Sequence, residues 1–180
     1  MARRLSRRHE VVSMPQVRRV AGWLAQLVLF LVILFGIQAW MTRDAPRGPA
    51  PELSGKLLNA DQRMVDLADY RGKPLLVHFW ATWCPVCKFS HGAVESVSRD
   101  YPVLTVAMQS GAEGEINRYL QQQGWSNAVM NDADGHLSQL WKVHGVPMNF
   151  ILDREGNIRF VERGYTSSMG LRIRLWLAAR

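Results

Sequence analysis

An uncharged apolar run of 22 residues, Val20 to Met41, constrains the fold of this chain more than any other feature. Its sequence is VAGWLAQLVLFLVILFGIQAWM, in which two glutamines are the only strongly polar side chains. A helix of this length spans the roughly 30 Å hydrocarbon core of a bilayer. A core helix of a globular protein keeps a polar stripe, and this run has none. We therefore predict a transmembrane anchor over residues 20–41.

A cleaved signal peptide is the main alternative for this run. The apolar region of a signal peptide has about 7–15 residues and is followed by small residues at the cleavage site. The run here is longer, and Ile37 is too large for the position two residues before a cut after Ala39. The sequence therefore favours an uncleaved anchor.

The charges on the two sides of the run indicate its orientation. Residues 1–19 contain six arginines and one glutamate, a net charge of +5 out of +7 for the chain. Because positive residues stay on the cytoplasmic side, we expect a cytoplasmic N-terminus and a periplasmic domain on a single-pass protein of the bacterial inner membrane. The rest of the chain has no basic stripe interleaved with aromatics, so nucleic acid is not an expected partner.

The remaining sequence predicts a linker and one domain. Residues 42–55, TRDAPRGPAPELSG, have the Pro, Gly and Ala content that is typical of a linker. Residues 56–180 are long enough for a single core. Their apolar runs and amphipathic segments follow the order of a hairpin and then β-α-β-α-β-α-β-β-α. We therefore predict an α/β sandwich with a mixed central sheet.

The most distinct elements flank the two cysteines of the chain. Residues 74–80, PLLVHFW, form a continuous apolar run that is typical of a strand buried on both faces. A helix is predicted from about Cys84 to Tyr101. Further along, we predict a helix closed by Gly124 and a final helix capped by Ser167 or Ser168.

Cys84 and Cys87 are separated by two residues in the segment WCPVC. A structural disulfide this short closes almost no loop, and a structural zinc site needs four ligands, which a single pair does not supply. In a redox dithiol, the local environment must stabilise the thiolate form of one of the two cysteines. Cys84 opens a helix with Pro85 in its first turn, and a helix N-terminus lowers the pKa of a thiol. We predict that Cys84 is the attacking sulfur and that Cys87, covered by Trp80 and Phe89, is the resolving one.

The segment LLVHFWATWCPVCK resembles the active-site segment of the thioredoxin superfamily. Within it, FWATWCP resembles the membrane-anchored TlpA/ResA-like branch, and Pro85 with Val86 resembles the suppressor-for-copper-sensitivity protein D group. The likeness covers residues 52–180. It implies a thioredoxin-like sandwich with an N-terminal β-hairpin, and a redox-active Cys84–Cys87 disulfide that needs no cofactor.

The resemblance also implies a surface on which partner proteins dock. It makes Pro147, in VHGVPMNFILDREGNI, a cis-proline beside the dithiol, and it makes Val146 the residue whose backbone meets a bound partner strand. Trp83, Pro85 and Val86 line the same surface by this likeness. The implied partners are periplasmic protein thiols and disulfides, with a DsbD-like membrane protein as electron donor.

Two positions depart from the pattern of this branch. His78 stands six residues before the first cysteine, where thioredoxin-like proteins often have Asp or Asn. Ser90 stands three residues after the second cysteine, where the branch often has Glu. Either His78 substitutes for the acid in proton transfer, because histidine titrates near neutral pH, or it is a core histidine with no catalytic part.

We interpret the chain as a membrane-anchored periplasmic thiol–disulfide oxidoreductase. Pro85 and Val86 offer a thiolate neither charge nor a side-chain hydrogen bond, which favours a reducing protein over a strong oxidant. One alternative is a thiol reductant for cytochrome c maturation. Another is a copper-binding or copper-stress domain, in which Cys84, Cys87 and His91 form a three-ligand site for Cu(I).

Overall fold

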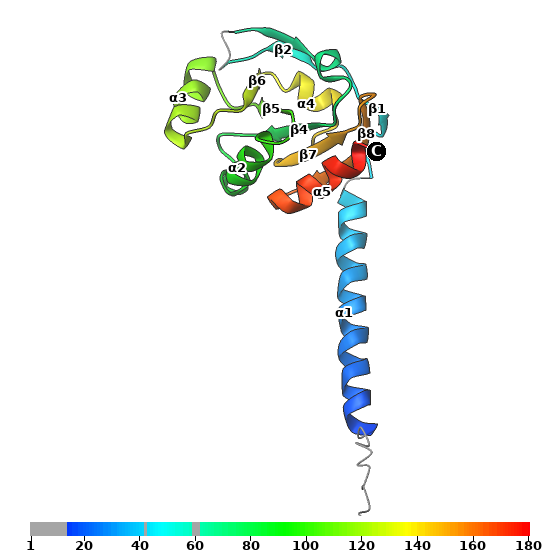
Figure 1. The fold of residues 1–180 in the computed structure, drawn as a ribbon. Coiled ribbons are helices and arrows are strands. Elements are labelled where there is room, and N and C mark those ends of the chain that lie inside the picture. The colour runs from blue at the N-terminus through cyan, green and yellow to red at the C-terminus, as the bar shows by residue number, and fades with distance from the viewer. Residues whose placement is uncertain (1–13, 42, 59–61) are drawn as a thin grey trace, which may run out of the picture. The chain divides into compact units, whose positions relative to one another are not determined.

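The apolar N-terminal run forms one long helix, α1 (Met14–Met41) (Figure 1). The computed structural model describes residues 14–41, 43–58 and 62–180. The segment Gly22–Trp40 of α1 has a mean hydropathy of 2.0 and none of it is buried. By length and composition, this helix can cross a membrane. Residues 1–13 of the predicted basic segment lie outside the described residues.

A six-stranded mixed sheet forms the centre of the unit that begins at Met41. Its strand order is β1-β8-β7-β4-β5-β6, in which β4, β5 and β6 are parallel and the other pairs are antiparallel. The strands are β1 (Gly48–Pro49), β4 (Leu75–Trp80), β5 (Val103–Met108), β6 (Ala128–Asp132), β7 (Met148–Leu152) and β8 (Asn157–Arg163). The predicted α/β sandwich with a mixed sheet is confirmed.

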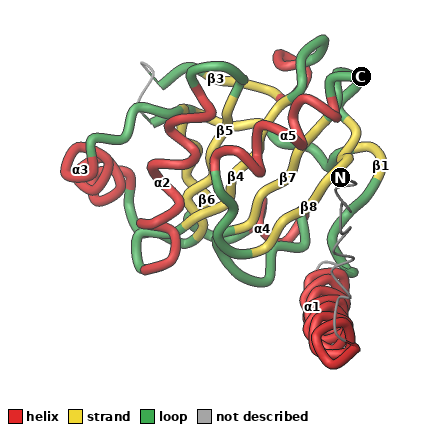
Figure 2. The backbone as a smooth tube through the Cα atoms, turned by 60° about the horizontal axis from the view of Figure 1, so that its bottom comes forward, coloured by secondary structure: helices red, strands yellow, loops and turns green. Residues whose placement is uncertain are grey.

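Helices and a hairpin cover the two faces of the sheet (Figures 1 and 2). The first hydrophobic core joins the sheet to helices α2, α3 and α5, and the second joins it to the hairpin and to Trp141 at the end of α4. The bounds are α2 (Pro85–Ser98), α3 (Glu113–Gln123), α4 (His136–Leu140), α5 (Ser168–Ala178), β2 (Ser54–Lys56), β3 (Met64–Asp66) and a short 3-10 helix, Leu67–Tyr70. Residues 59–61, at the tip of the hairpin, lie outside the described part.

Strand β4 is buried on both faces, as its apolar run predicts. Successive side chains of a strand point to opposite faces. Leu76 and Trp80 belong to the core beneath α2, whereas Val77 and Phe79 belong to the opposite core. His78 therefore lies on the α2 side of the sheet, between two residues of the core that also contains the cysteines.

Local sequence signals determine where the helices end. Gly124 ends α3 in the left-handed conformation (φ +63°), which glycine adopts without steric cost. Ser167 caps α5, since its Oγ accepts a hydrogen bond from the N–H of Gly170 at 3.2 Å. Both boundaries agree with the prediction from sequence.

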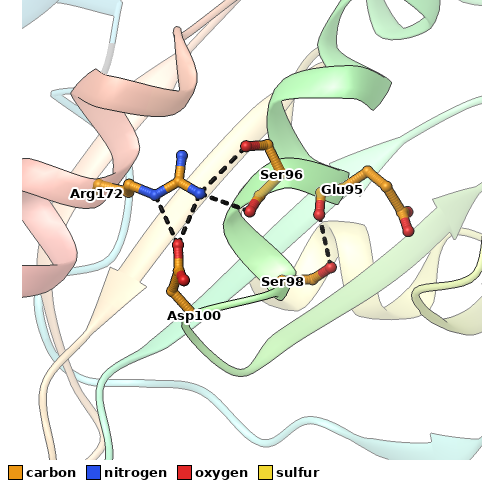
Figure 3. A network of polar contacts seen from close by, with 5 residues as sticks. All are labelled: Glu95, Ser96, Ser98, Asp100 and Arg172. Carbon is orange, nitrogen blue, oxygen red and sulfur yellow. Dashed lines mark hydrogen bonds and ion pairs between the residues drawn. The ribbon is translucent and has the colours of Figure 1, made fainter.

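Arg172 of α5 binds the C-terminal end of α2 (Figure 3). Its Nη2 donates to the backbone carbonyl of Ser96 at 2.7 Å, and its Nε donates to Asp100 Oδ2 at 2.8 Å. A cation at this position also complements the partial negative charge of a helix C-terminus. The contact fixes α5 beside the helix that carries the dithiol.

Most of the predicted linker, residues 42–55, packs as part of the domain. Ala45 and Leu53 are buried, and β1 pairs with β8. The N–H of Ala50 donates to the carbonyl of Gly156 at 3.1 Å. The proline and glycine content that indicated a linker belongs here to a sheet edge, where proline is tolerated because its missing N–H is not needed.

Candidate functional site

Cys84 and Cys87 are joined by a disulfide at the junction of β4 and α2, where the sequence predicts them. Cys84 is the N-cap of α2, and its Sγ accepts a hydrogen bond from the backbone N–H of Cys87 at 3.2 Å. Pro85 occupies the first turn, where its missing N–H costs nothing. The free N–H groups and partial positive charge of the helix end stabilise a thiolate at Cys84.

The two cysteines are both buried and differ slightly in exposure. Cys87 has no exposed surface, and Cys84 keeps 4%. Trp80 is fully buried in the same core as Cys87, as predicted. Phe89 does not cover Cys87, and that part of the prediction is wrong: its side chain is 76% exposed. The buried face of α2 includes Cys87 and Ser90, and Phe89 lies on the opposite side of the helix.

An exposed apolar rim formed by Trp83, Val86 and Phe89 lies next to Cys84 in the chain. The indole N–H of Trp83 donates to the carbonyl of Gln109 at 3.1 Å, which fixes this ring while most of it stays in contact with solvent. Pro85 is also exposed. Clustered exposed apolar side chains are typical of a contact surface for another protein.

A cis peptide bond joins Val146 and Pro147, which confirms the cis-proline expected from the resemblance. The carbonyl oxygen of Val146 lies 3.6 Å from Sγ of Cys84, so this segment borders the dithiol. Pro147 is buried and Val146 is partly exposed. Strand β7 begins at the next residue, so the sheet holds this segment against Cys84.

His78 is fully buried in β4, and its Nδ1 lies 2.7 Å from Oδ1 of Asn149 on the neighbouring strand β7. Burial lowers the pKa of His78 to about 4, against a smaller opposing effect of the hydrogen bond to Asn149. The ring is therefore neutral at neutral pH. Its Nε2 has no hydrogen-bond partner among the described residues.

His91 packs against aromatic rings. Its ring centroid lies 3.7 Å from that of Trp125 and 5.6 Å from that of Trp80. Burial lowers the pKa of His91 to about 4, with smaller contributions from His78 and Lys88. The nearby positive charge of Lys88 disfavours the imidazolium, in the same direction as burial.

The copper alternative is not supported by this arrangement. Among the residues that the structure describes, no group of three or more His, Cys, Asp or Glu side chains lies close enough together to hold a metal ion. The three-ligand set Cys84, Cys87 and His91 is therefore not assembled.

Ser90, at the second position that departs from the branch, donates its hydroxyl to the carbonyl of Val86 at 3.2 Å.

Sequence reasoning missed Asn149, Tyr119 and Trp125 as neighbours of His78 and His91. Asn149 is the only polar residue of β7, in the run MNFIL, and it is 2% exposed. Buried polar side chains are usually hydrogen-bonded, so an isolated amide in an apolar strand is a signal that can be sought in a sequence. Tyr119 and Trp125 have no comparable signal, because aromatic residues are common in any core.

Comparisons with known proteins agree with this geometry. A family model described as Redoxin matches residues 45–170. The chain is 34% identical over 109 residues to a thioredoxin-like protein of Haemophilus influenzae. The match covers 60% of this chain and 65% of that relative, so the chain spans slightly under two thirds of the relative's length. It is 30% identical over 159 residues to the thiol:disulfide interchange protein DsbE of Tatumella citrea, covering 77% of this chain and 82% of the relative.

Two further matches concern the branch and the fold. The thiol-disulfide oxidoreductase ResA of Oceanobacillus iheyensis is 25% identical over 149 residues and 77% of each chain. The crystal structure of a thiol:disulfide interchange protein of the thioredoxin family from Chlorobium tepidum matches with a TM-score of 0.63 at 27% identity, over 75% of this chain and 98% of that one. These matches confirm the thioredoxin-like fold and the TlpA/ResA-like resemblance, whereas the closer likeness to the suppressor-for-copper-sensitivity protein D group stays a prediction.

Proposed function

The chain belongs to the Redoxin family, and from that premise we propose that it is a membrane-anchored thiol–disulfide oxidoreductase that acts on periplasmic protein partners. The observation that carries the proposal is the position of Cys84. This residue caps α2 and lies 3.6 Å from the carbonyl of Val146, beside the cis peptide bond. Its sulfur is thus the one that a partner reaches, at a helix end that stabilises a thiolate.

We propose that the exchange proceeds through a mixed disulfide on Cys84. The Cys84 thiolate of the reduced chain attacks one sulfur of a partner disulfide, and the other partner sulfur leaves as a thiolate. The Cys87 thiol then loses its proton and attacks Sγ of Cys84. The bond from Cys84 to the partner breaks, its electron pair leaves with the partner sulfur that was bound to Cys84, and the Cys84–Cys87 disulfide forms. Two electrons pass to the partner.

His78 is our candidate for the acceptor of the Cys87 proton. Its ring lies on the α2 side of the sheet, and Asn149 is the partner of Nδ1, which leaves Nε2 as the basic nitrogen. The lowered pKa keeps this nitrogen unprotonated at neutral pH. General-base assistance of this kind typically contributes about 10²–10⁴-fold to a rate.

The exposed apolar rim and the segment Val146–Pro147 form the proposed docking surface. Trp83, Val86 and Phe89 offer apolar area around the dithiol, and Val146 offers its backbone to an extended partner segment. Pro85 shapes the same surface at the start of α2. Partners of this kind are proteins with an accessible disulfide.

We propose that the chain reduces its partners. Pro85 and Val86 add neither charge nor a side-chain hydrogen bond that would stabilise the Cys84 thiolate further, and a less stabilised thiolate gives a more reducing protein. A DsbD-like membrane protein would return the electrons. Equilibration of the full chain with glutathione tests the direction, and a potential near about −120 mV, that of a strong periplasmic oxidant, would contradict it.

The arginine-rich residues 1–19 and the apolar helix α1 support a single-pass topology with the domain outside the cytoplasm. A membrane-impermeant thiol reagent added to intact spheroplasts tests this topology on the reduced chain. Labelling of Cys84 without lysis is the expected result. Labelling only after lysis would place the domain in the cytoplasm.

A Cys87→Ser variant tests the exchange mechanism in cells. Without the resolving thiol, partners stay on Cys84 as mixed disulfides, which non-reducing gels resolve and mass spectrometry identifies. A Cys84→Ser, Cys87→Ser double variant is the matched control and should trap nothing. Trapped apocytochromes would indicate a role in cytochrome c maturation. Absence of trapped species under both oxidising and reducing growth would contradict the mechanism.

A further inference from the structure

Four buried polar atoms on neighbouring rings have no hydrogen-bond partner within residues 14–41, 43–58 and 62–180. They are Nε2 of His78, Nε2 of His91, the hydroxyl of Tyr119 and Nε1 of Trp125. Each such group costs about 1–3 kcal/mol if it is desolvated without compensation. Buried polar groups in folded proteins are therefore paired with protein groups or with ordered water.

These side chains, together with Trp80, form what we call the ring cluster. Trp125 lies at its centre, with its ring centroid 6.2 Å from that of His78, 3.7 Å from that of His91 and 4.6 Å from that of Trp80. Tyr119 of α3 stacks on Trp80 at 5.5 Å and meets the edge of His91 at 5.9 Å. The four unpartnered atoms thus belong to one contiguous group of side chains.

The chemistry of the four atoms matches water better than an ion. Trp125 offers only an N–H donor, which disfavours a cation. His78 has its Nδ1 engaged with Asn149, so its Nε2 offers a lone pair, which disfavours an anion. The hydroxyl of Tyr119 can donate and accept. A ligand that both donates and accepts satisfies all of them, and water is the smallest such ligand.

Two members of the ring cluster, Trp80 and Trp125, belong to the same buried core as Cys87. His91 is one helical turn from Cys87 on α2, and His78 lies on the same side of the sheet as the core that contains Cys87. Toward the outside, Trp125 lines an open surface hollow of about 440 Å³, and His91 is only partly buried.

We propose that the ring cluster holds ordered water that carries the Cys87 proton from Nε2 of His78 to solvent past His91 and Tyr119. The inference rests on the proposed function and deepens it. As Cys87 attacks Cys84 in the mixed disulfide, its thiol proton passes to Nε2 of His78 and then to this water. A proton leaves the water for solvent, and the partner sulfur displaced from Cys84 leaves as a thiolate with the electron pair of the broken bond.

Other ionisable groups lie near the ring cluster on α2 and on β8. On α2 these are Lys88 and Glu95, the latter hydrogen-bonded to Ser126 and Asn127 beside Trp125. On β8, Glu162 is the cross-strand neighbour of Asn149, and it forms an ion pair with Arg174 of α5 at 2.6 Å. Variants that test the water path must leave these groups in place.

A Tyr119→Phe variant of the full chain in detergent tests the proposal, because it removes only the hydroxyl. The measured step is the release of glutathione from a Cys84–glutathione mixed disulfide by Cys87, followed by stopped-flow tryptophan fluorescence in H₂O and D₂O. We expect the step to slow about tenfold, with a changed solvent isotope effect and an unchanged glutathione equilibrium. Tyr165→Phe, which removes an exposed hydroxyl that is not part of the ring cluster, is the matched control and should behave as the wild type.

A second variant, His91→Gln, keeps the test decisive if Tyr119→Phe folds poorly, and it should slow the same step. Wild-type rates and isotope effects in both variants would overturn the water path while leaving the proposed function intact. A raised unfolding midpoint in Tyr119→Phe with no kinetic change would also overturn it, since the hydroxyl would then be merely unsatisfied. A wild-type chain that never releases glutathione would overturn the proposed function, and this inference with it.

Discussion

His78 and Asn149 face each other across β4 and β7, with Nδ1 of the imidazole 2.7 Å from Oδ1 of the amide. Neither side chain is more than 2% exposed. An amide oxygen can only accept, so Nδ1 donates and the ring is held in the tautomer with a basic Nε2. The pair is a polar contact between central strands, and it determines which nitrogen of His78 can take a proton.

Replacing Asn149 with Leu should destabilise the domain by about 1–3 kcal/mol, because the N–H of His78 is left buried without an acceptor. Urea unfolding of the full chain in detergent measures this difference. The matched control is Met148→Leu, at the neighbouring buried position of β7, where a swap of similar volume should cost less than about 1.5 kcal/mol. Equal losses in the two variants would mean that the hydrogen bond contributes no more than packing.

The free energy of unfolding should fall as the pH drops from about 6.5 to about 4. The pKa of His78 is about 4 in the folded chain against 6.5 for the free side chain, so in this window only the unfolded state binds the proton. The slope from His78 is about 1.4 kcal/mol per pH unit. His91, whose pKa is also lowered to about 4, acts in the same direction but less strongly because it is partly exposed.

Unfolding midpoints measured at intervals between pH 4 and 7 check this slope. A His78→Leu variant should lose the part of the slope that His78 contributes, whatever its absolute stability. A variant with the full wild-type slope would show that other groups cause the pH dependence.

A Val86→His substitution should make the protein more oxidising. Val86 is 43% exposed in the first turn of α2, so histidine fits there without disturbing the core. A positive or hydrogen-bonding ring beside Cys84 stabilises the thiolate and hence the reduced form. One pKa unit at Cys84 corresponds to a rise in potential of about 30 mV. Glutathione equilibria measure it, and Val86→Ala, as the control, should stay near the wild-type value.

Phe89→Ser should slow exchange with a folded protein partner without changing stability. The ring is 76% exposed, so the free energy of unfolding should stay within about 0.5 kcal/mol of wild type. Exchange with oxidised glutathione should be unaffected, because a small disulfide does not need the exposed apolar rim. Met169→Ser, at a 65% exposed position on α5, is the control. If both variants exchange with the protein partner at the wild-type rate, Phe89 is not part of the docking surface.

The sequence predicts the centre of this fold well, because the relevant signals are local. The apolar run of β4, the proline after Cys84 and the glycine after α3 each act within a few residues. The sequence of residues 42–55 is ambiguous, because a short edge strand has the same proline and glycine content as a linker. The position of Phe89 depends on the rotation of α2 about its axis, which the burial of Cys87 and Ser90 decides.

The neighbours of His78 depend on tertiary structure and were not predicted. Asn149 meets it only because β7 inserts beside β4, although 71 residues separate the two in the chain. Tyr119 lies on α3 and Trp125 lies in the segment that follows it, and their rings contact His91 and His78 from there. The periodicity of a single segment does not predict contacts between residues that are far apart in the chain. Cys84, Pro85 and Cys87 lie within one helical turn, so the sequence predicts their arrangement.

Cys84 is both the proposed attacking residue and the N-cap of α2, so a change in the bonds of its sulfur also changes how the start of the helix is capped. The amide of Cys87 donates to that sulfur, and its hydrogen exchange with solvent therefore depends on whether the sulfur is a disulfide, a thiolate or a bond to a partner. A thiolate is the strongest acceptor of the three. Exchange protection at this single amide should thus report the redox state of the chain without any added probe.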